Sequence, residues 1–382
     1  MSAEFQTRDH HLTLLQNGAE FFPCLCAEID AARYSVYLET YLFAADETGR
    51  RVSAALQRAA LRDVAVHLLL DGFGSAALPQ QWVDELRGAG VKVRWFRRGR
   101  DVFRLRRYQL RRLHRKLAVI DGETAFVGGI NIIDDIPGNT FLRMPRLDYA
   151  VRVRGRVARE VQAEMRRLWM VVNWSRRKRI SRARYQLRRK VREAVVQPLT
   201  LLLRDIQPAY LQAMASAQRE IIIANAYFLP GRAFRRAMTD AAQRGVRVVL
   251  LLQGRVEYRL QHYATQALYD RLLAAGIEVY EYQPSYLHAK VAVVDGVWAT
   301  VGSANIDPLS LLLAREANLV VRGAEFAGAL RGALLAAIAA HSLPIELKNW
   351  RKQGWARRMV SRMSYAVLRL LITLLGMGKR DV

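Results

Sequence analysis

The residues of this sequence best suited to chemistry occur in two copies of one motif, His-x-Lys-x4-Asp followed by Gly-[Gly/Ser]-x-Asn. The two copies are His114, Lys116, Asp121, Gly128, Gly129, Asn131 and His288, Lys290, Asp295, Gly302, Ser303, Asn305. Every internal spacing is the same in both copies, which lie 174 positions apart. Because a match of this length does not arise twice by accident, the duplication indicates that the two copies share one chemical task.

That task is predicted to be cleavage of a phosphodiester. One imidazole can attack phosphorus while the other, protonated, gives a proton to the departing alkoxide. Groups beside the histidines can hold the non-bridging oxygens and balance the charge of the transition state; the candidates are Lys116, Lys290, Asn131, Asn305, Ser303 and Gly129. This chemistry needs no cofactor and no metal, and neither motif offers a closed set of metal ligands. The repeat leaves open which histidine attacks.

Each histidine needs a partner that fixes its tautomer and orientation. Glu316 lies 28 residues after His288, and Asp148 lies 34 residues after His114. Each acid stands at the start of an apolar run, so we expect both to orient histidines. Asp121 and Asp295 complete the motif, but an Asp before Gly is also an ordinary turn residue, and we expect these two to support the site without carrying protons.

Both motif copies sit in the same local pattern. An apolar run (117–120; 291–294) is followed by Asp-Gly and a second apolar run, which predicts strand, tight turn, strand. Histidine and lysine then share one face, because side chains in a strand repeat every second residue. Further repeats precede the hairpins: residues 39–43 match 225–229, and 90–93 match 276–279, both at an offset of 186.

The repeats predict an α/β fold made of two fused copies of one α/β/α domain, each with a mixed sheet and with the active site at the interface. At 382 residues the chain is long enough for two cores. We expect the first domain at 1–175, a basic linker of helical character at 176–195, the second domain at 196–345, and a basic amphipathic tail at 346–382. The sequence gives no indication of oligomeric state.

The charge of the chain points to a polyanionic partner. Sixty basic and 34 acidic residues leave a net charge of +26, which fits both nucleic acid and an anionic membrane. Residues 350–377 mix Trp, Tyr and Leu with arginines, and their uncharged stretch is too short to span a bilayer. We therefore expect an interfacial helix; the alternative is an amphipathic helix packed on the second domain. Residues 1–9 are polar and do not look like a signal peptide, so we expect the chain on the cytoplasmic side.

These motifs resemble those of the phospholipase D superfamily, whose signature is the duplicated His-x-Lys-x4-Asp with Gly-[Gly/Ser]-x-Asn behind it. Within it, the first half looks most like bacterial cardiolipin synthases of the short type, without N-terminal membrane spans. The stretches that carry this resemblance are 17–22, 38–41, 70–75 and 128–131. The segments 94–115, which is dense in arginine, and 135–146 fit the family pattern less clearly and leave acceptor specificity open.

The resemblance implies transphosphatidylation through a phosphatidyl-histidine. With phosphatidylglycerol as donor and acceptor, the products are cardiolipin and glycerol. By analogy His114 is the nucleophile, and His288 is the acid and then the base. The resemblance also implies a peripheral protein on the cytoplasmic face of the bacterial inner membrane.

Three alternatives carry different expectations. A hydrolytic phospholipase D has the same motifs and releases phosphatidic acid. A nuclease would use the basic segment 94–115 to follow a phosphate backbone, but few aromatic residues there could stack on bases, and we expect no nucleic-acid partner. A non-catalytic lipid-binding module predicts a broken motif in one half, whereas both copies are intact.

Overall fold

A computed structural model describes residues 3–7, 9–98, 111–136, 144–175, 199–203, 206–308, 310, 314–352 and 354–374. The linker predicted at 176–195 and parts of segments 94–115 and 135–146 lie outside the described residues.

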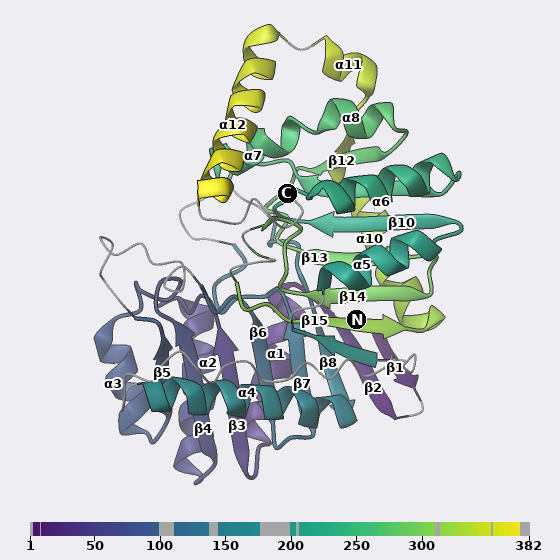
Figure 1. Cartoon of the computed structure of the whole chain (residues 1–382). Coiled ribbons are helices and arrows are strands. Elements are labelled where there is room, and N and C mark those ends of the chain that lie inside the picture. Colours follow the sequence, from purple (N-terminus) through teal and green to yellow (C-terminus); the bar gives the residue numbers. More distant parts are fainter. Residues whose placement is uncertain are drawn as a thin grey trace.

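The first half of the chain builds one eight-stranded sheet (Figure 1). In spatial order its strands are β1 (Ala3–Thr7), β2 (His10–Gln16), β8 (Tyr149–Gly155), β7 (Thr124–Gly128), β6 (Lys116–Ile120), β3 (Ser35–Thr40), β4 (Ala65–Asp71) and β5 (Lys92–Phe96). Strands β3, β4 and β5 are parallel, and the other neighbours are antiparallel, so the sheet is mixed.

The second half repeats this order in a second eight-stranded sheet. Its strands are β16 (Ser342–Pro344), β12 (Glu278–Tyr282), β11 (Arg247–Gln253), β10 (Glu220–Asn225), β13 (Lys290–Val294), β14 (Trp298–Gly302), β15 (Asn318–Arg322) and β9 (Leu199–Leu202). The run from β12 to β9 corresponds to the run from β5 to β2 in the first sheet. The predicted α/β class with two copies of one mixed-sheet fold is confirmed.

Helices complete the hydrophobic cores. In the first half these are α1 (Asn17–Asp30), α2 (Glu47–Leu61), α3 (Gln80–Gly88) and α4 (Arg156–Ser175). In the second half they are α5 (Ile206–Ser216), α6 (Arg232–Gln243), α7 (Arg259–Gln266), α8 (Tyr269–Ala274), α10 (Ala324–His341), α11 (Leu347–Arg351) and α12 (Trp355–Leu374). Helices α1 to α3 pack on the first sheet, and α5 to α8 and α12 pack on the second. Helices α4 and α10 share a central core with residues of both sheets, which joins the halves.

The motif hairpins lie in the middle of the sheets. Strands β6 and β13 are buried at every residue, as expected of strands covered on both faces. The Asp121-Gly122 turn that closes the first hairpin has φ of 53° and 72°, and the Asp295-Gly296 turn has 53° and 68°. Two successive positive φ angles are what a type I′ hairpin turn requires.

The C-terminal segment folds onto the second half. Trp350, Leu368 and Ile372 are buried in the core that also holds α5 to α8, so the packed helix considered as the alternative is present. The same helix exposes Trp355, Met363 and other large apolar side chains. No described helix is both long and apolar enough to cross a membrane. Contact of this helix with a membrane stays a prediction.

Candidate active site

The two motif histidines lie where the halves meet. Each lies just before the first strand of its hairpin. The backbone N–H of each histidine donates a hydrogen bond to the opposite half. The His114 N–H donates to the Arg315 carbonyl oxygen at 3.0 Å, and the His288 N–H donates to the Leu147 carbonyl oxygen at 2.9 Å. Because the acidic residue follows directly in the chain at both contacts, these backbone bonds bring a carboxylate of one half beside the histidine of the other.

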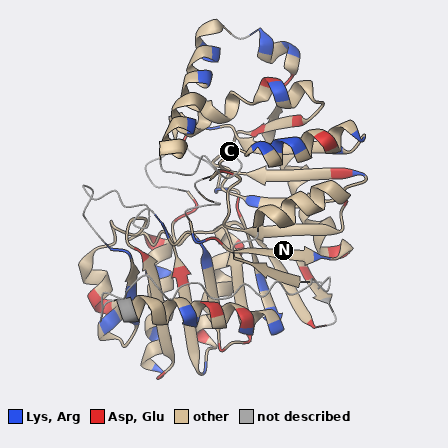
Figure 2. Cartoon of the chain, viewed as in Figure 1, with Lys and Arg blue, Asp and Glu red and all other residues tan. Residues whose placement is uncertain are grey.

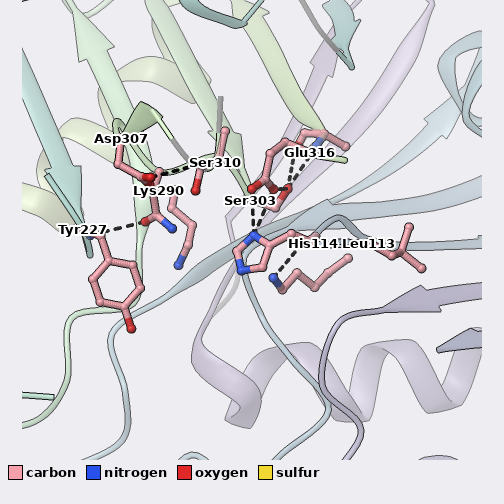
Figure 3. Close-up of polar contacts among 12 residues, drawn as sticks. Leu113, His114, Tyr227, Lys290, Ser303, Asp307, Ser310 and Glu316 are labelled. Carbon is pink, nitrogen blue, oxygen red and sulfur yellow. Dashed lines mark hydrogen bonds and ion pairs between the residues drawn. The ribbon is translucent and has the colours of Figure 1, made fainter. Parts of the chain in front are cut away.

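The carboxylates therefore cross over between the halves. Glu316 accepts from His114 Nδ1, with Oε1 at 2.9 Å and Oε2 at 3.0 Å (Figure 3). Asp148 accepts from His288 Nδ1 at 2.6 Å. The sequence named both acids as orienting residues without assigning a histidine to either, and the structure pairs each acid with the histidine of the opposite half. A bond at Nδ1 leaves Nε2 of each imidazole available for chemistry.

The two carboxylates are held by different means. Ser303 Oγ donates to Glu316 Oε2 at 2.6 Å, and the Ala317 N–H donates to Ser303 Oγ at 3.0 Å. At Gly129 a Cβ atom would lie 2.3 Å from Asp148 Oδ1, so only glycine leaves room for that carboxylate. Gly129 and Ser303 thus stand behind the histidines against the carboxylates, which corrects their predicted position at the phosphate.

The motif lysines are buried beside the histidines. Lys116 Nζ donates to the His114 carbonyl oxygen at 2.6 Å, and Lys290 Nζ donates to the His288 carbonyl oxygen. Figure 3 shows the Lys290 side chain directed toward the region of the His114 ring. Lys290 is fully buried, so its positive charge has little solvent to stabilise it and is well placed to attract an anion.

The asparagines complete the buried polar set. Asn305 Oδ1 accepts from the Tyr227 N–H at 3.3 Å. Asn131 is buried, and its Oδ1 has no hydrogen-bond partner among the described residues. Buried amide oxygens normally accept a hydrogen bond, so the unpaired Oδ1 of Asn131 fits a site that receives a ligand. Phosphate binding by both asparagines stays a prediction.

Burial shifts the pKa values of the site in ways that suit acid and base chemistry. It lowers the pKa of His114, and it lowers the pKa of His288 further because Lys290 and Lys116 add their charge. Burial raises the pKa of Asp148 to about 6 and lowers the pKa of Lys116 to about 7. Only 17% of the His114 side chain and 12% of the His288 side chain are exposed, so the site is nearly dry.

The motif aspartates lie at the other end of the strands. Asp121 lies five residues beyond Lys116 along the strand, a length of roughly 16 Å, so Asp121 cannot touch a group bound at the histidines. Both carboxylates accept three backbone N–H groups at 2.7 to 2.9 Å, from Arg33, Tyr34 and Ser35 for Asp121 and from Gln218, Arg219 and Glu220 for Asp295. They are therefore not among the catalytic residues: each anchors its hairpin turn to the start of the neighbouring strand, β3 in the first half and β10 in the second.

Comparison with known proteins gives a consistent result. The family described as "Cardiolipin synthase, PLD-like domain" matches residues 25–169 and 210–335. Cardiolipin synthase B of Escherichia coli K12 is 36% identical over 96% of this chain and 89% of its own length. Cardiolipin synthase of Geobacillus thermodenitrificans is 31% identical over 94% of this chain and 72% of its own. This chain belongs to the cardiolipin synthase family.

A solved structure supports the fold. Phosphatidylserine synthase of Haemophilus influenzae superposes with a TM-score of 0.66 at 14% identity, covering 99% of this chain and 96% of the other. At that identity the likeness concerns architecture alone. It places this member of the cardiolipin synthase family in a fold of two phospholipase D-like halves.

Sequence reasoning missed two groups that position the histidine loops of this cardiolipin synthase relative. Asp71 Oδ2 accepts from the Leu113 N–H at 2.8 Å, and Gln253 Oε1 accepts from the Leu287 N–H at 3.0 Å. Each bond fixes the residue just before a motif histidine. Asp71 ends β4 and Gln253 ends the corresponding strand β11, but nothing in the sequence showed which loop they hold.

Aromatic residues of the same repeat also reach the site. The Tyr41 ring lies edge-on to the His114 ring at 5.0 Å between centroids, and Lys116 Nζ lies 5.5 Å from the Tyr41 ring centroid. At the matching position, Tyr227 donates its hydroxyl to Glu257 Oε2 at 2.7 Å. The repeat 39–43 with 225–229 identified both tyrosines as equivalent, although not as neighbours of the site.

The described residues contain no group of three or more His, Cys, Asp or Glu side chains arranged to hold a metal ion.

Proposed function

We propose that this protein is a cardiolipin synthase that transfers a phosphatidyl group between two phosphatidylglycerol molecules. One observation carries the proposal: two histidines at the junction of the halves, each with a carboxylate of the opposite half at Nδ1. Such a pair can supply a nucleophile and a proton donor to one phosphodiester. The family membership selects a phospholipid as that phosphodiester.

In the first step Nε2 of His114 attacks phosphorus of the donor lipid. A phosphorus–nitrogen bond forms, the bond from phosphorus to the head-group glycerol oxygen breaks, and His288 gives that oxygen a proton. Glu316 stabilises the positive charge that develops on the attacking imidazole. Lys116, Lys290 and the two motif asparagines supply charge and donors to the non-bridging oxygens.

In the second step a hydroxyl of another phosphatidylglycerol head group attacks the phosphatidyl-histidine. His288, now neutral, accepts the proton of that hydroxyl, and the bond from phosphorus to His114 breaks. Two phosphatidylglycerol molecules thus give cardiolipin and glycerol, with no net proton change. A dry site favours the lipid hydroxyl over water, because water that entered would release phosphatidic acid.

His288 takes up the proton that it delivers when the substrate binds. In the free site its pKa lies well below the usual range because of burial and the neighbouring lysines. A bound phosphodiester brings a negative charge next to these lysines and raises the pKa of the imidazole. Binding of the donor therefore prepares His288 for its role as the acid.

The second half presents the surface that would meet the membrane. Figure 2 shows basic residues on α11 and along α12, and α12 exposes 49% of Met359, 59% of Met363 and 58% of Leu370. Apolar and basic side chains on one helix suit the boundary of an anionic bilayer. We infer peripheral attachment to the cytoplasmic face of the bacterial inner membrane.

The test is to incubate the purified protein with phosphatidylglycerol vesicles and identify the lipid products by mass spectrometry. We expect cardiolipin and glycerol, and neither product with His114→Ala. Phosphatidic acid as the sole product would make the protein a hydrolase. Cleavage of a nucleic acid without any lipid product would show a nuclease and overturn the proposal.

A further inference from the structure

A cavity of about 600 Å³ opens in the second half, between α8 on one side and α11 with α12 on the other. Its volume lies within the range of small-ligand sites, roughly 300 to 1,000 Å³. None of the motif residues or their carboxylates lines it. It is therefore a feature separate from the histidine pair.

The wall of this cavity is strongly basic. Arg271 comes from α8, Arg351 from α11, and Arg358 and Arg362 from α12. The single acidic residue in the lining, Asp270, is bonded to Arg351 at 2.7 Å. Four guanidinium groups against one carboxylate leave an excess of positive charge, and guanidinium groups bind phosphate oxygens through paired N–H donors.

A buried hydroxyl in the same wall lacks a partner. Ser361 is 4% exposed and lines the cavity between the two α12 arginines, and its Oγ has no hydrogen-bond partner among the described residues. A buried hydroxyl without a hydrogen-bond partner destabilises the folded protein. A ligand with acceptor oxygens in the cavity would remove that destabilisation. The rings of Trp350 and Tyr365 line the remaining wall, which is amphipathic.

The same helix carries an apolar track on its outer face, opposite the side that packs on the second half. Met359, Met363, Val367, Leu370 and Leu374 are spaced three to four residues apart on α12, and each is at least 45% exposed. Acyl chains can follow such a track while a head group stays at the arginines. Inorganic phosphate would use the arginines alone, whereas a lipid would use both surfaces.

We propose that this cavity binds the phosphate head group of an anionic phospholipid, with its acyl chains along α12, as a docking site distinct from the catalytic histidines. The site would hold the second half against the bilayer while a different lipid molecule reacts. The proposal rests on the proposed function only in taking a phospholipid membrane as the partner. Binding of a lipid in the cavity requires no turnover.

The experiment compares two double variants that lose the same charge. R358Q/R362Q removes two cavity arginines, and R232Q/R236Q removes two exposed arginines from α6 that lie outside the cavity. Binding is measured by flotation with phosphatidylcholine vesicles containing phosphatidic acid, a lipid without a head-group alcohol to be displaced. At about 1 kcal/mol per arginine, we expect a loss of roughly 30-fold for the first variant and at most about threefold for the second.

Three further measurements test the opposite wall of the cavity, competition by inorganic phosphate and turnover of a monomeric substrate. Arg271→Gln, on the opposite wall, is expected to weaken binding as well, and inorganic phosphate is expected to compete poorly. Turnover of monomeric dihexanoyl phosphatidylglycerol should be unchanged in R358Q/R362Q, whatever its product. Equal losses in both double variants, full competition by inorganic phosphate, or a fall in monomer turnover would overturn the proposal. A failure of cardiolipin synthesis in the unaltered protein would leave these binding results readable on their own.

Discussion

The two halves hold their histidines in the same place with different supports. In the first half a buried ion pair, Arg115 Nε to Glu39 Oε2 at 2.5 Å, braces the start of the histidine strand. The second half has Ala289 and Asn225 at the matching positions, and there the Asn225 side chain accepts from the Ile306 N–H instead. The shared requirement is the position of the histidine backbone, and either support satisfies it.

The supports behind the imidazoles differ in the same manner. The longer carboxylate, Glu316, receives a hydrogen bond from Ser303, whereas the shorter one, Asp148, occupies the space that Gly129 leaves open. A hydroxyl in one half and the absence of a side chain in the other thus give equivalent hydrogen bonds to Nδ1. The motif therefore fixes the position of each histidine and its carboxylate, while the residues that support them differ between the halves.

The largest expected effect separates the roles of the histidines. His114→Ala and His288→Ala should each lower turnover of phosphatidylglycerol by about 10⁴-fold or more. With a phosphatidyl ester of p-nitrophenol, whose leaving group needs no proton, His288→Ala should still form a covalent phosphatidyl enzyme, and His114→Ala should form none. Intact-protein mass spectrometry after rapid quenching reads the adduct. An adduct on His114→Ala alone would reverse the assignment of nucleophile and acid.

The next effect tests the crossed pairing. Glu316→Gln and Asp148→Asn should lower kcat by on the order of 10²-fold or more, because an amide no longer stabilises the charged imidazole. With the p-nitrophenyl ester, Glu316→Gln should slow adduct formation, and Asp148→Asn should leave it near normal. The reverse pattern would mean that each carboxylate serves its own half.

A smaller pair of changes tests the two means of support. Gly129→Ala should displace the Asp148 carboxylate and lower kcat by about 100-fold, close to Asp148→Asn. Ser303→Ala removes one hydrogen bond to Glu316 and should cost about 1–1.5 kcal/mol, or roughly tenfold. Both variants should keep the wild-type melting temperature within a few degrees. Equal losses of kcat in Gly129→Ala and Ser303→Ala would contradict the expectation that the two supports contribute unequally.

The pH dependence should carry the signature of two ionisable groups of the site. Asp148 must be ionised to support His288, and burial raises its pKa to about 6, so kcat/KM should fall as the pH drops through 6. Lys116 must be charged to bind the phosphodiester, and burial lowers its pKa to about 7, so kcat/KM should fall as the pH rises above 7. The expected profile of the free enzyme is therefore a narrow bell. Asp148→Asn should flatten the acidic limb; a limb that persists would assign it to another group.

The smallest effect on catalysis is expected at the motif aspartates. Asp121→Ala and Asp295→Ala each leave three backbone N–H groups without their acceptor, and each should lower the free energy of unfolding by about 1–3 kcal/mol. Because both residues lie at the far end of their strands, kcat of the folded fraction should stay within a few-fold of wild type. Chemical denaturation and assays at low temperature provide the two measurements. A loss of kcat without a loss of stability would return these residues to the catalytic set.

Much of the fold was predictable from local patterns. Continuous apolar runs around Asp-Gly turns indicated the hairpins, and the offset repeats indicated two copies of one mixed sheet. The C-terminal tail was predicted only in part, because the same helix buries Leu368 and Ile372 and exposes Met363. Composition alone does not distinguish a helix that packs on a domain from one that lies on a bilayer.

The sequence by itself determined the reactive groups, because the type and spacing of His114, Lys116 and Asn131 and of their second copies specify one chemistry. Only the tertiary structure decided the partners: Glu316 supports His114, and Asp148 supports His288, across the junction of the halves. The spacing of residues along the chain shows which side chains share one face of a strand. A contact between two sheets depends on how their backbones bond at the junction, and that information is not local.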